Sequence, residues 1–522
     1  MNKKLNKTIS TLLIGGGLML GATGCTDNFE DYNTNPMEPT PDQMEGDFAA
    51  TATLISNMIP TIAQGQENNY QMLDQMIGCE YGHMTAALNQ WGTDMYFGTY
   101  NPPTGWSGTV FDTTMPQIYT PFFKIRDISG ENSLVYHWAN LLRIFGSLRV
   151  SDCYGPIPFS KIGSGSDFTV EYDDMPTLYN AMFDELDKAI SGLKESVGST
   201  TTATLFGDVD YVYGGDIAKW VKFANTLKLR MALRLVNVNP TLAQQKAEEA
   251  ANDPSGLIES SADAAWSTFT PGGNALHKVS ELWGEGRISA DITAYMTGYN
   301  DPRLAAYAKA NSNGDYIGAR NGVYHFDRGS FGKYSAPNAD ATSALLSISA
   351  SESWFSRAEG ALRGWNMGGK SAKELYEKGI TVSMEERKVA IGNYLSSTAT
   401  PADYTAIDNT SHNTSAASSI TPKYDEADGF EKNLERIMVQ KWLGNFPNGW
   451  ETWSDFRRTG YPKFFPVVDN RSTDGVSSTR GARRLPYPQS EFNTNEANVK
   501  AAQAMLGGAD NMATDLWWAK KD

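Results

Sequence analysis

The chain has 522 residues and carries 60 acidic against 44 basic side chains, so its formal net charge is −16. A surface this acidic argues against nucleic acid as a partner, because binding to phosphates needs clustered Lys and Arg. It also argues against electrostatic docking on anionic lipid. The 13 Trp, 24 Tyr and 22 Phe are a heavy aromatic load, and some of these rings must lie at the surface.

The amino terminus has the pattern of an export signal. Lys3, Lys4 and Lys7 precede an apolar run over residues 9–20, which is too short to span a membrane. The run leads into "ATGC" at 22–25, which resembles a bacterial lipobox although Ala22 stands where Leu is usual. We therefore expect a signal peptide over 1–24, lipidation of Cys25 and an extended tether over 25–45. Plain secretory cleavage near the same point is the alternative.

From about residue 46 onward helical periodicity dominates, and we expect one domain over 46–522. Apolar residues recur at spacings of three and four over 133–150, 178–195 and 216–236, which predicts one buried stripe on each of three helices. Long insertions are expected between the helices, at about 89–121, 253–342 and 391–424. The first two carry aromatic residues and glycines, which favours binding loops. The third is rich in Thr, Ser and Asn, which favours disorder or a mobile surface.

The stretch "GWNMGGKS" at 364–371 matches the phosphate-binding pattern G-x-x-x-x-G-K-[ST]. A nucleotide site would need a buried strand before the glycines, whereas 351–363 has the apolar period of a helix. Ser371 and Glu374 have the spacing of a capping box that opens another helix over 371–388. The segment "FFPVVD", which ends at Asp469, contains a proline that a central Walker B strand would not tolerate. The glycines are therefore predicted to join two helices, in a hairpin close to the 34 residues of a tetratricopeptide unit.

The segment "NGWETWSDFRRTG" at 448–460 also predicts structure rather than a site. Trp450, Trp453 and Phe456 recur every three residues, which indicates the buried face of a helix. Charged residues of the same segment are expected to pair close to that face: Glu451, Asp455, Arg457 and Arg458. Cys79 and Cys153 fit either a disulfide or two buried free thiols, and we favour free thiols.

Several long segments together resemble the SusD/RagB family of nutrient-binding lipoproteins of Bacteroidetes. The segments are "DYNTNPMEPT" (31–40), "RVSDCYGPIPFSK" (149–161), "LRGWNMGGKSAKELYEKGI" (362–380), "ERIMVQKWLGNFPNGWETWSDFRRTGYPKF" (435–464), "RRLPYPQSEFNTNEANV" (483–499) and "TDLWW" (514–518).

The resemblance implies a mostly α-helical fold, in which tetratricopeptide-like hairpins form a scaffold with long, irregular ligand-binding insertions. It also implies a position on the outer face of the outer membrane, beside a SusC-like TonB-dependent transporter. The expected ligand is an oligosaccharide, or a peptide as in some members. Asp27, Glu30 and Asp31 resemble the acidic signal that sends such lipoproteins to the cell surface.

A glycan site needs exposed aromatic platforms flanked by hydrogen-bonding side chains, because sugar rings have apolar C–H faces and hydroxyl edges. The first two insertions supply such residues, although any one of these rings could instead fill the core or contact the transporter. The candidate ligand-binding residues are Asn89, Trp91, Asp94, Tyr96, Asn101, Trp106, Trp266, Trp283, Arg287 and Tyr324, with Gln90, Tyr100 and Phe331 beside them.

The sequence does not favour an enzyme. The histidines His83, His137, His277, His325 and His412 lack the spacing of H-E-x-x-H, and G-x-S-x-G is absent. Glycoside hydrolysis needs only two carboxylates at a defined separation, and the chain has 60 acidic residues, so a surface glycoside hydrolase stays the rival outside the binding proteins. No cofactor or metal is expected; a structural Ca²⁺ is conceivable, but no D-x-[DN]-x-[DN]-G loop is present.

Overall fold

The computed structural model describes residues 49–89, 95–103, 105–163, 169–198, 206–268, 273–324 and 328–521. Contacts divide the chain into Met1–Ala50 and Thr51–Asp522, and the second unit carries the fold. The expected signal peptide, Cys25 and the tether lie outside the described residues, so they stay predictions.

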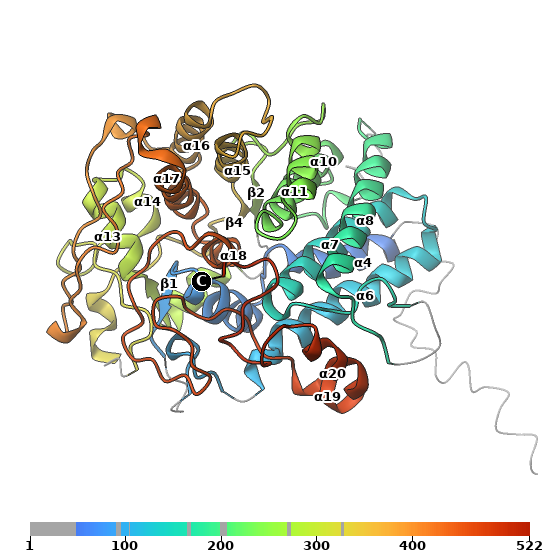
Figure 1. The fold of residues 1–522 in the computed structure, drawn as a ribbon, viewed down its shortest axis with the longest axis horizontal. Helices are drawn as coiled ribbons and strands as arrows, with labels where there is room; N and C mark the ends of the chain where they lie inside the picture. The colour runs from blue at the N-terminus through green and yellow to red at the C-terminus, as the bar shows by residue number, and fades with distance from the viewer. Residues whose placement is uncertain are drawn as a thin grey trace, which may run out of the picture. The chain divides into compact units, whose positions relative to one another are not determined.

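Helical hairpins form the scaffold of this unit. α6 (Thr109–Ser129) packs against α7 (Leu134–Tyr154), which packs against α8 (Met175–Glu195). α10 (Ile217–Arg234) contacts α8 and α11 (Pro240–Ala251), and these helices lie together in Figure 1. The helices predicted over 133–150, 178–195 and 216–236 are confirmed as α7, α8 and α10, but only α8 has a single buried stripe. α7 is buried on all sides from Trp138 to Tyr154, and α10 from Phe223 to Arg234, because other helices surround them. Their N-cap side chains, Ser133, Asp174 and Asp216, each accept a backbone N–H of the first turn.

A second group of helices contacts the first through α10 and α11, which both pack against α15. α15 (Ala350–Leu362) packs against α16 (Ala372–Glu386) and α17 (Gly429–Gly444), and α18 (Gly449–Thr459) packs against the π-helix η2 (Tyr70–Cys79) (Figure 1). The shorter helical segments are α4 (Ala49–Met58), η1 (Ile59–Thr61), α5 (Glu67–Asn69), η3 (Phe97–Thr99), η4 (Trp106–Gly108), α12 (Ala275–His277), η5 (Lys278–Leu282), α13 (Ala290–Tyr299), α14 (Leu304–Tyr307), η6 (Arg328–Lys333), η7 (Tyr394–Ser396), η8 (Thr410–His412), η9 (Glu426–Asp428), α19 (Gln489–Thr494) and α20 (Glu496–Ala504).

The glycine motif at 364–371 joins α15 to α16. Ser371 and Glu374 form the predicted capping box, in which each side chain accepts the other residue's backbone N–H. Gly364 and Gly368 have φ values of 84° and 82°, a left-handed conformation that favours glycine. Because a helix and not a strand precedes the glycines, the motif is a helix–helix turn.

Strands are short in the described part of the chain. β1 (Thr85–Ala87) pairs antiparallel with β3 (Gly286–Ile288), and β2 (Ala265–Ser267) pairs antiparallel with β4 (Leu345–Ile348). Each pair joins segments far apart in the sequence. Such pairing cannot be read from local periodicity.

Three predictions about the insertions need correction. α6 begins at Thr109, so the last part of the predicted 89–121 loop is helical despite Pro116 and Pro121. The 253–342 insertion contains α13, which is mostly buried. The 391–424 segment is not disordered: Ala402 N–H donates to Ala294 O over 2.9 Å, Tyr404 OH to Gly318 O over 2.7 Å, and Tyr299 OH to Ile420 O over 2.9 Å.

α18 confirms the structural interpretation of 448–460. Trp450, Trp453 and Phe456 are all buried. Glu451 pairs with Arg234 of α10 and Lys441 of α17, and Arg458 pairs with Glu359 of α15. Cys79 and Cys153 are buried free thiols, as favoured.

Candidate glycan-binding site

The β1–β3 pair brings together polar side chains from three parts of the chain. Asn89 follows β1 and Glu285 precedes β3, and Asn89 Nδ2 donates to Glu285 Oε1 over 2.5 Å. Gln71 Nε2, from η2, donates to the other oxygen of the same carboxylate. We call Gln71, Asn89, Trp283, Glu285 and Arg287 the β1–β3 face. Sequence reasoning found Asn89 but missed Gln71 and Glu285, because only the strand pairing makes them neighbours.

Trp283 supplies the aromatic part of this face. It follows η5, is half-buried and packs against a small cluster that contains Tyr70 and Val279. The preceding residue, Leu282, is 67% exposed. An aromatic ring held this way beside amide and carboxylate groups offers both kinds of contact that a sugar ring uses.

Arg287 is held by the protein's own backbone. Its guanidinium donates to the carbonyls of Ser280, Gly286 and Phe331 over 2.8, 2.7 and 3.0 Å. Burial lowers the pKa of this group. Because its donors are directed at backbone carbonyls, Arg287 holds the loops of the β1–β3 face in place rather than presenting its guanidinium group to a ligand.

Other candidates lie in the core or outside the described residues. Tyr96 is buried and donates to Ala87 O, and it bridges to half-buried Asn101. Tyr324 is buried, with the Arg471 guanidinium carbon 3.2 Å from its ring centre. Trp106 is half-buried at η4 and packs on the main core. The neighbouring candidates Tyr100 and Phe331 are also buried, whereas Gln90, Trp91 and Asp94 lie outside the described residues.

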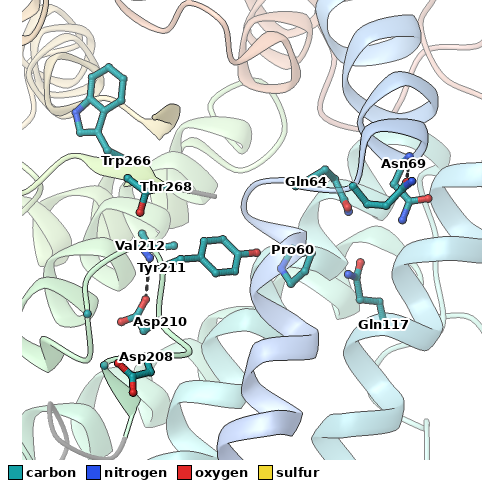
Figure 2. Close-up of a pocket in the computed structure, with 14 residues that line it drawn as sticks. Pro60, Gln64, Asn69, Gln117, Asp208, Asp210, Tyr211, Val212, Trp266 and Thr268 are labelled. Atoms are coloured by element: carbon teal, nitrogen blue, oxygen red, sulfur yellow. Dashed lines mark hydrogen bonds between the residues drawn. The ribbon is translucent and has the colours of Figure 1, made fainter. Parts of the chain in front are cut away.

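Trp266 is in a different place. It lies in β2, at the rim of a cavity of about 650 Å³ that Figure 2 shows in close-up. Its ring centre is 5.2 Å from the Arg387 guanidinium, which covers part of the indole. None of the residues of the β1–β3 face lines this cavity.

Glu80 is a buried carboxyl beneath the β1–β3 face that sequence reasoning also missed. Its Oε2 accepts the Ala87 N–H over 2.8 Å, at the end of β1. Burial raises the pKa of Glu80 to about 7, and the Ala87 hydrogen bond offsets only part of this effect. The ordinary value is 4.5, so the folded chain holds a proton that the unfolded chain loses at much lower pH.

We expect Glu80→Gln to stabilise the protein at pH 8, by about 2 kcal/mol. The raised pKa means that wild-type stability falls as pH rises from 4.5 to about 7, because the unfolded chain releases this proton first. Gln stays neutral at every pH, so the variant lacks this contribution to the pH dependence of the free energy of unfolding. Urea unfolding of the wild type and of Glu80→Gln at pH 5 and pH 8 measures the difference in the free energy of unfolding. If the two proteins lose the same stability between pH 5 and pH 8, Glu80 does not titrate in this pH range.

In the described residues, no group of three or more His, Cys, Asp or Glu side chains is placed to hold a metal ion. None of the described helices is both long and apolar enough to span a bilayer.

Comparison with protein families gives a match over residues 31–519 to the family described as SusD-like, Susd and RagB outer membrane lipoprotein. The chain belongs to the SusD-like family. No curated protein matches this SusD-like protein.

Solved structures of SusD-like proteins share the fold. One from Bacteroides thetaiotaomicron is 37% identical, with a TM-score of 0.84 over 90% of this chain and 99% of the other. A homologue from Bacteroides ovatus is 35% identical, with a TM-score of 0.85 over 91% and 100%. A homologue from Flavobacterium johnsoniae, described as chitin-binding, is 33% identical, with a TM-score of 0.85 over 92% and 99%. The mostly helical fold predicted from the sequence is therefore confirmed.

Proposed function

We propose that this SusD-like protein captures oligosaccharides at the β1–β3 face and passes them to a SusC-like TonB-dependent transporter. The observation that carries the proposal is the half-buried Trp283, two residues before Glu285, together with the Gln71–Glu285–Asn89 contacts. The ring can stack on the C–H face of a sugar, and the carboxylate and amide groups can bind hydroxyls. Membership of a family with a chitin-binding homologue supports glycan as the ligand class.

Lipidated Cys25 would anchor the protein at the outer face of the outer membrane, and the tether over 25–45 would let the domain reach the transporter. Binding would use stacking and hydrogen bonds, without cofactor, metal ion or bond cleavage. The β1–β3 face suits this role, because Glu285 is already engaged by two amides and so is poorly placed to act as a glycosidase acid or nucleophile.

Replacing Trp283 by Ala is expected to weaken glycan binding by about 2 kcal/mol, roughly thirtyfold, because aromatic anchors contribute most of the energy at such sites. The protein beginning at Thr26 would be screened by affinity gel electrophoresis and Trp fluorescence against polysaccharides and a mixed peptide digest. Trp365→Ala is the matched control, since Trp365 is also half-buried but lies in the α15–α16 turn.

Each outcome of the screen has a defined reading. Loss of glycan binding in Trp283→Ala but not in Trp365→Ala supports the proposal. Binding of peptides with no glycan response would indicate a peptide importer instead. Shortened glycan products after incubation would indicate a hydrolase.

A further inference from the structure

The cavity at Trp266 is large enough for a ligand of its own. Its volume of about 650 Å³ lies within the roughly 300–1,000 Å³ typical of small-molecule sites. One wall comes from residues 60–69 and from Gln117 of α6; the other comes from residues 207–214 and the end of β2. Figure 2 shows Tyr211 extending from the second wall toward Pro60, so its ring lies between the two walls.

The first wall carries polar atoms without partners. Gln64 Nε2 and Gln117 Oε1 are buried and have no hydrogen-bond partner within the described residues. In Figure 2 the Gln117 amide points from α6 toward Gln64. A buried polar atom left unpaired costs about 1–3 kcal/mol, and such atoms are rare in folded proteins. An unpaired donor and an unpaired acceptor in one wall suit a ligand rich in hydroxyls, each of which both donates and accepts.

The charges around the cavity restrict the ligand further. The only charged side chains among the lining residues that the structure describes are Asp208 and Asp210. Asp210 is engaged by the N–H groups of Tyr213 and Gly215 and by Trp220 Nε1, over 3.0, 2.8 and 2.8 Å. Asp208 is exposed at the rim. Without a lining Lys or Arg, the cavity disfavours uronic, sulfated or other anionic sugars.

The cavity and the β1–β3 face are lined from neighbouring positions where α5 leads into η2. Asn69 lines the cavity, whereas Gln71 reaches Glu285 on the β1–β3 face. We propose that the cavity is a second saccharide-binding site, separate from the β1–β3 face and selective for neutral or amino sugars. The inference takes its ligand class from the proposed function, but its residues are independent of that site.

The test uses full-length protein in detergent and calorimetric titration with chitotriose, cellotriose, maltotriose, mannotriose, a glucosamine trimer and trigalacturonic acid. The cavity variant combines Tyr211→Ala with Gln117→Leu, and Trp283→Ala removes the ring of the β1–β3 face. Tyr461→Ala is the matched control, because Tyr461 is half-buried but lines neither site. Because Tyr211 is also half-buried, Asp208→Lys at the exposed rim gives a second variant that keeps the core intact.

We expect at least one neutral trisaccharide to bind at two classes of site. The cavity variant weakens binding at one of them about tenfold, and Trp283→Ala leaves binding at that site unchanged. Asp208→Lys should weaken the glucosamine trimer severalfold. The inference is overturned if the cavity variant and Asp208→Lys match the control with every probe, or if none of the trimers binds the wild type. If Trp283→Ala abolishes all binding and the cavity variant has no effect, the result supports the proposed function and contradicts the second site. If the cavity variant abolishes all binding and Trp283→Ala has no effect, the result supports the cavity as a saccharide site and contradicts binding at the β1–β3 face.

Discussion

Glu451→Gln is expected to destabilise the protein by about 3–5 kcal/mol, because it removes a carboxylate charge that three buried cations share. Glu451 is 2% exposed. Its carboxylate lies 2.6 Å from Arg234 Nη2, 3.2 Å from Arg230 Nε and 3.0 Å from Lys441 Nζ. One side chain of α18 therefore links cations from α10 and α17, which also pair with Glu352, Asp152 and Asp455.

The charges keep Glu451 ionised inside the protein. Burial alone would raise the pKa of Glu451, but Arg234, Lys441 and Arg230 hold it well below its ordinary value. Gln preserves the shape of the side chain, but it removes the charge and replaces one accepting oxygen by a donating NH2 group. The loss therefore reports the charge and its hydrogen bonds rather than a cavity.

Urea unfolding followed by circular dichroism at pH 7 measures the effect. Glu496→Gln is the matched control, because Glu496 forms an exposed pair with Lys500 on α20, and its removal is expected to leave the midpoint unchanged. Equal midpoints for Glu451→Gln and the wild type would show that the buried network contributes nothing net to folding.

Local patterns predicted the scaffold well because helix periodicity is a short-range property. The helices α7, α8 and α10 and the Ser371 capping box could be predicted from neighbouring residues, although the burial of α7 and α10 on all sides could not. α6 was missed because two prolines disfavour a helix interior, whereas its buried residues Ile118, Phe122 and Ile125 stabilise it through tertiary packing. The polar 391–424 segment was misjudged for the same reason, since its hydrogen-bond partners lie far away in the sequence.

The candidate site was predicted less completely because composition does not tell which side of a loop faces solvent. Asn89, Trp283 and Arg287 come together through the β1–β3 pair, but Tyr96 and Tyr324 are buried. Trp266 belongs to the cavity, whose other residues come from segments at 60–69, 117 and 207–214. No local sequence pattern marks Gln64 or Gln117, because the sequence does not tell whether a glutamine lines a cavity or lies in solvent.

Gly449→Ala is expected to destabilise the protein by about 3 kcal/mol or more, because a methyl group at this position has no room. Gly449 opens α18 where this helix crosses η2. A Cβ there would lie 2.1 Å from Gly78 O, 2.3 Å from Gly78 C and 2.5 Å from Cys79 Cα. All three are backbone atoms, so no side chain can rotate away, and the two helices must separate.

Separating α18 from η2 would also disturb the hydrogen bonds and ion pairs that α18 makes. Trp450 follows Gly449 and donates to Asp74 Oδ1 of η2 over 2.9 Å, so moving α18 outward strains that bond as well as the ion pairs of Glu451. Gly332→Ala is the matched control, because Gly332 is exposed and a Cβ there meets no atom within 4 Å. Thermal unfolding of the two variants should separate them by several degrees. If Gly449→Ala and Gly332→Ala melt at the same temperature, η2 and α18 can move apart at little cost, and the close approach of their backbones at Gly78 does not stabilise the fold.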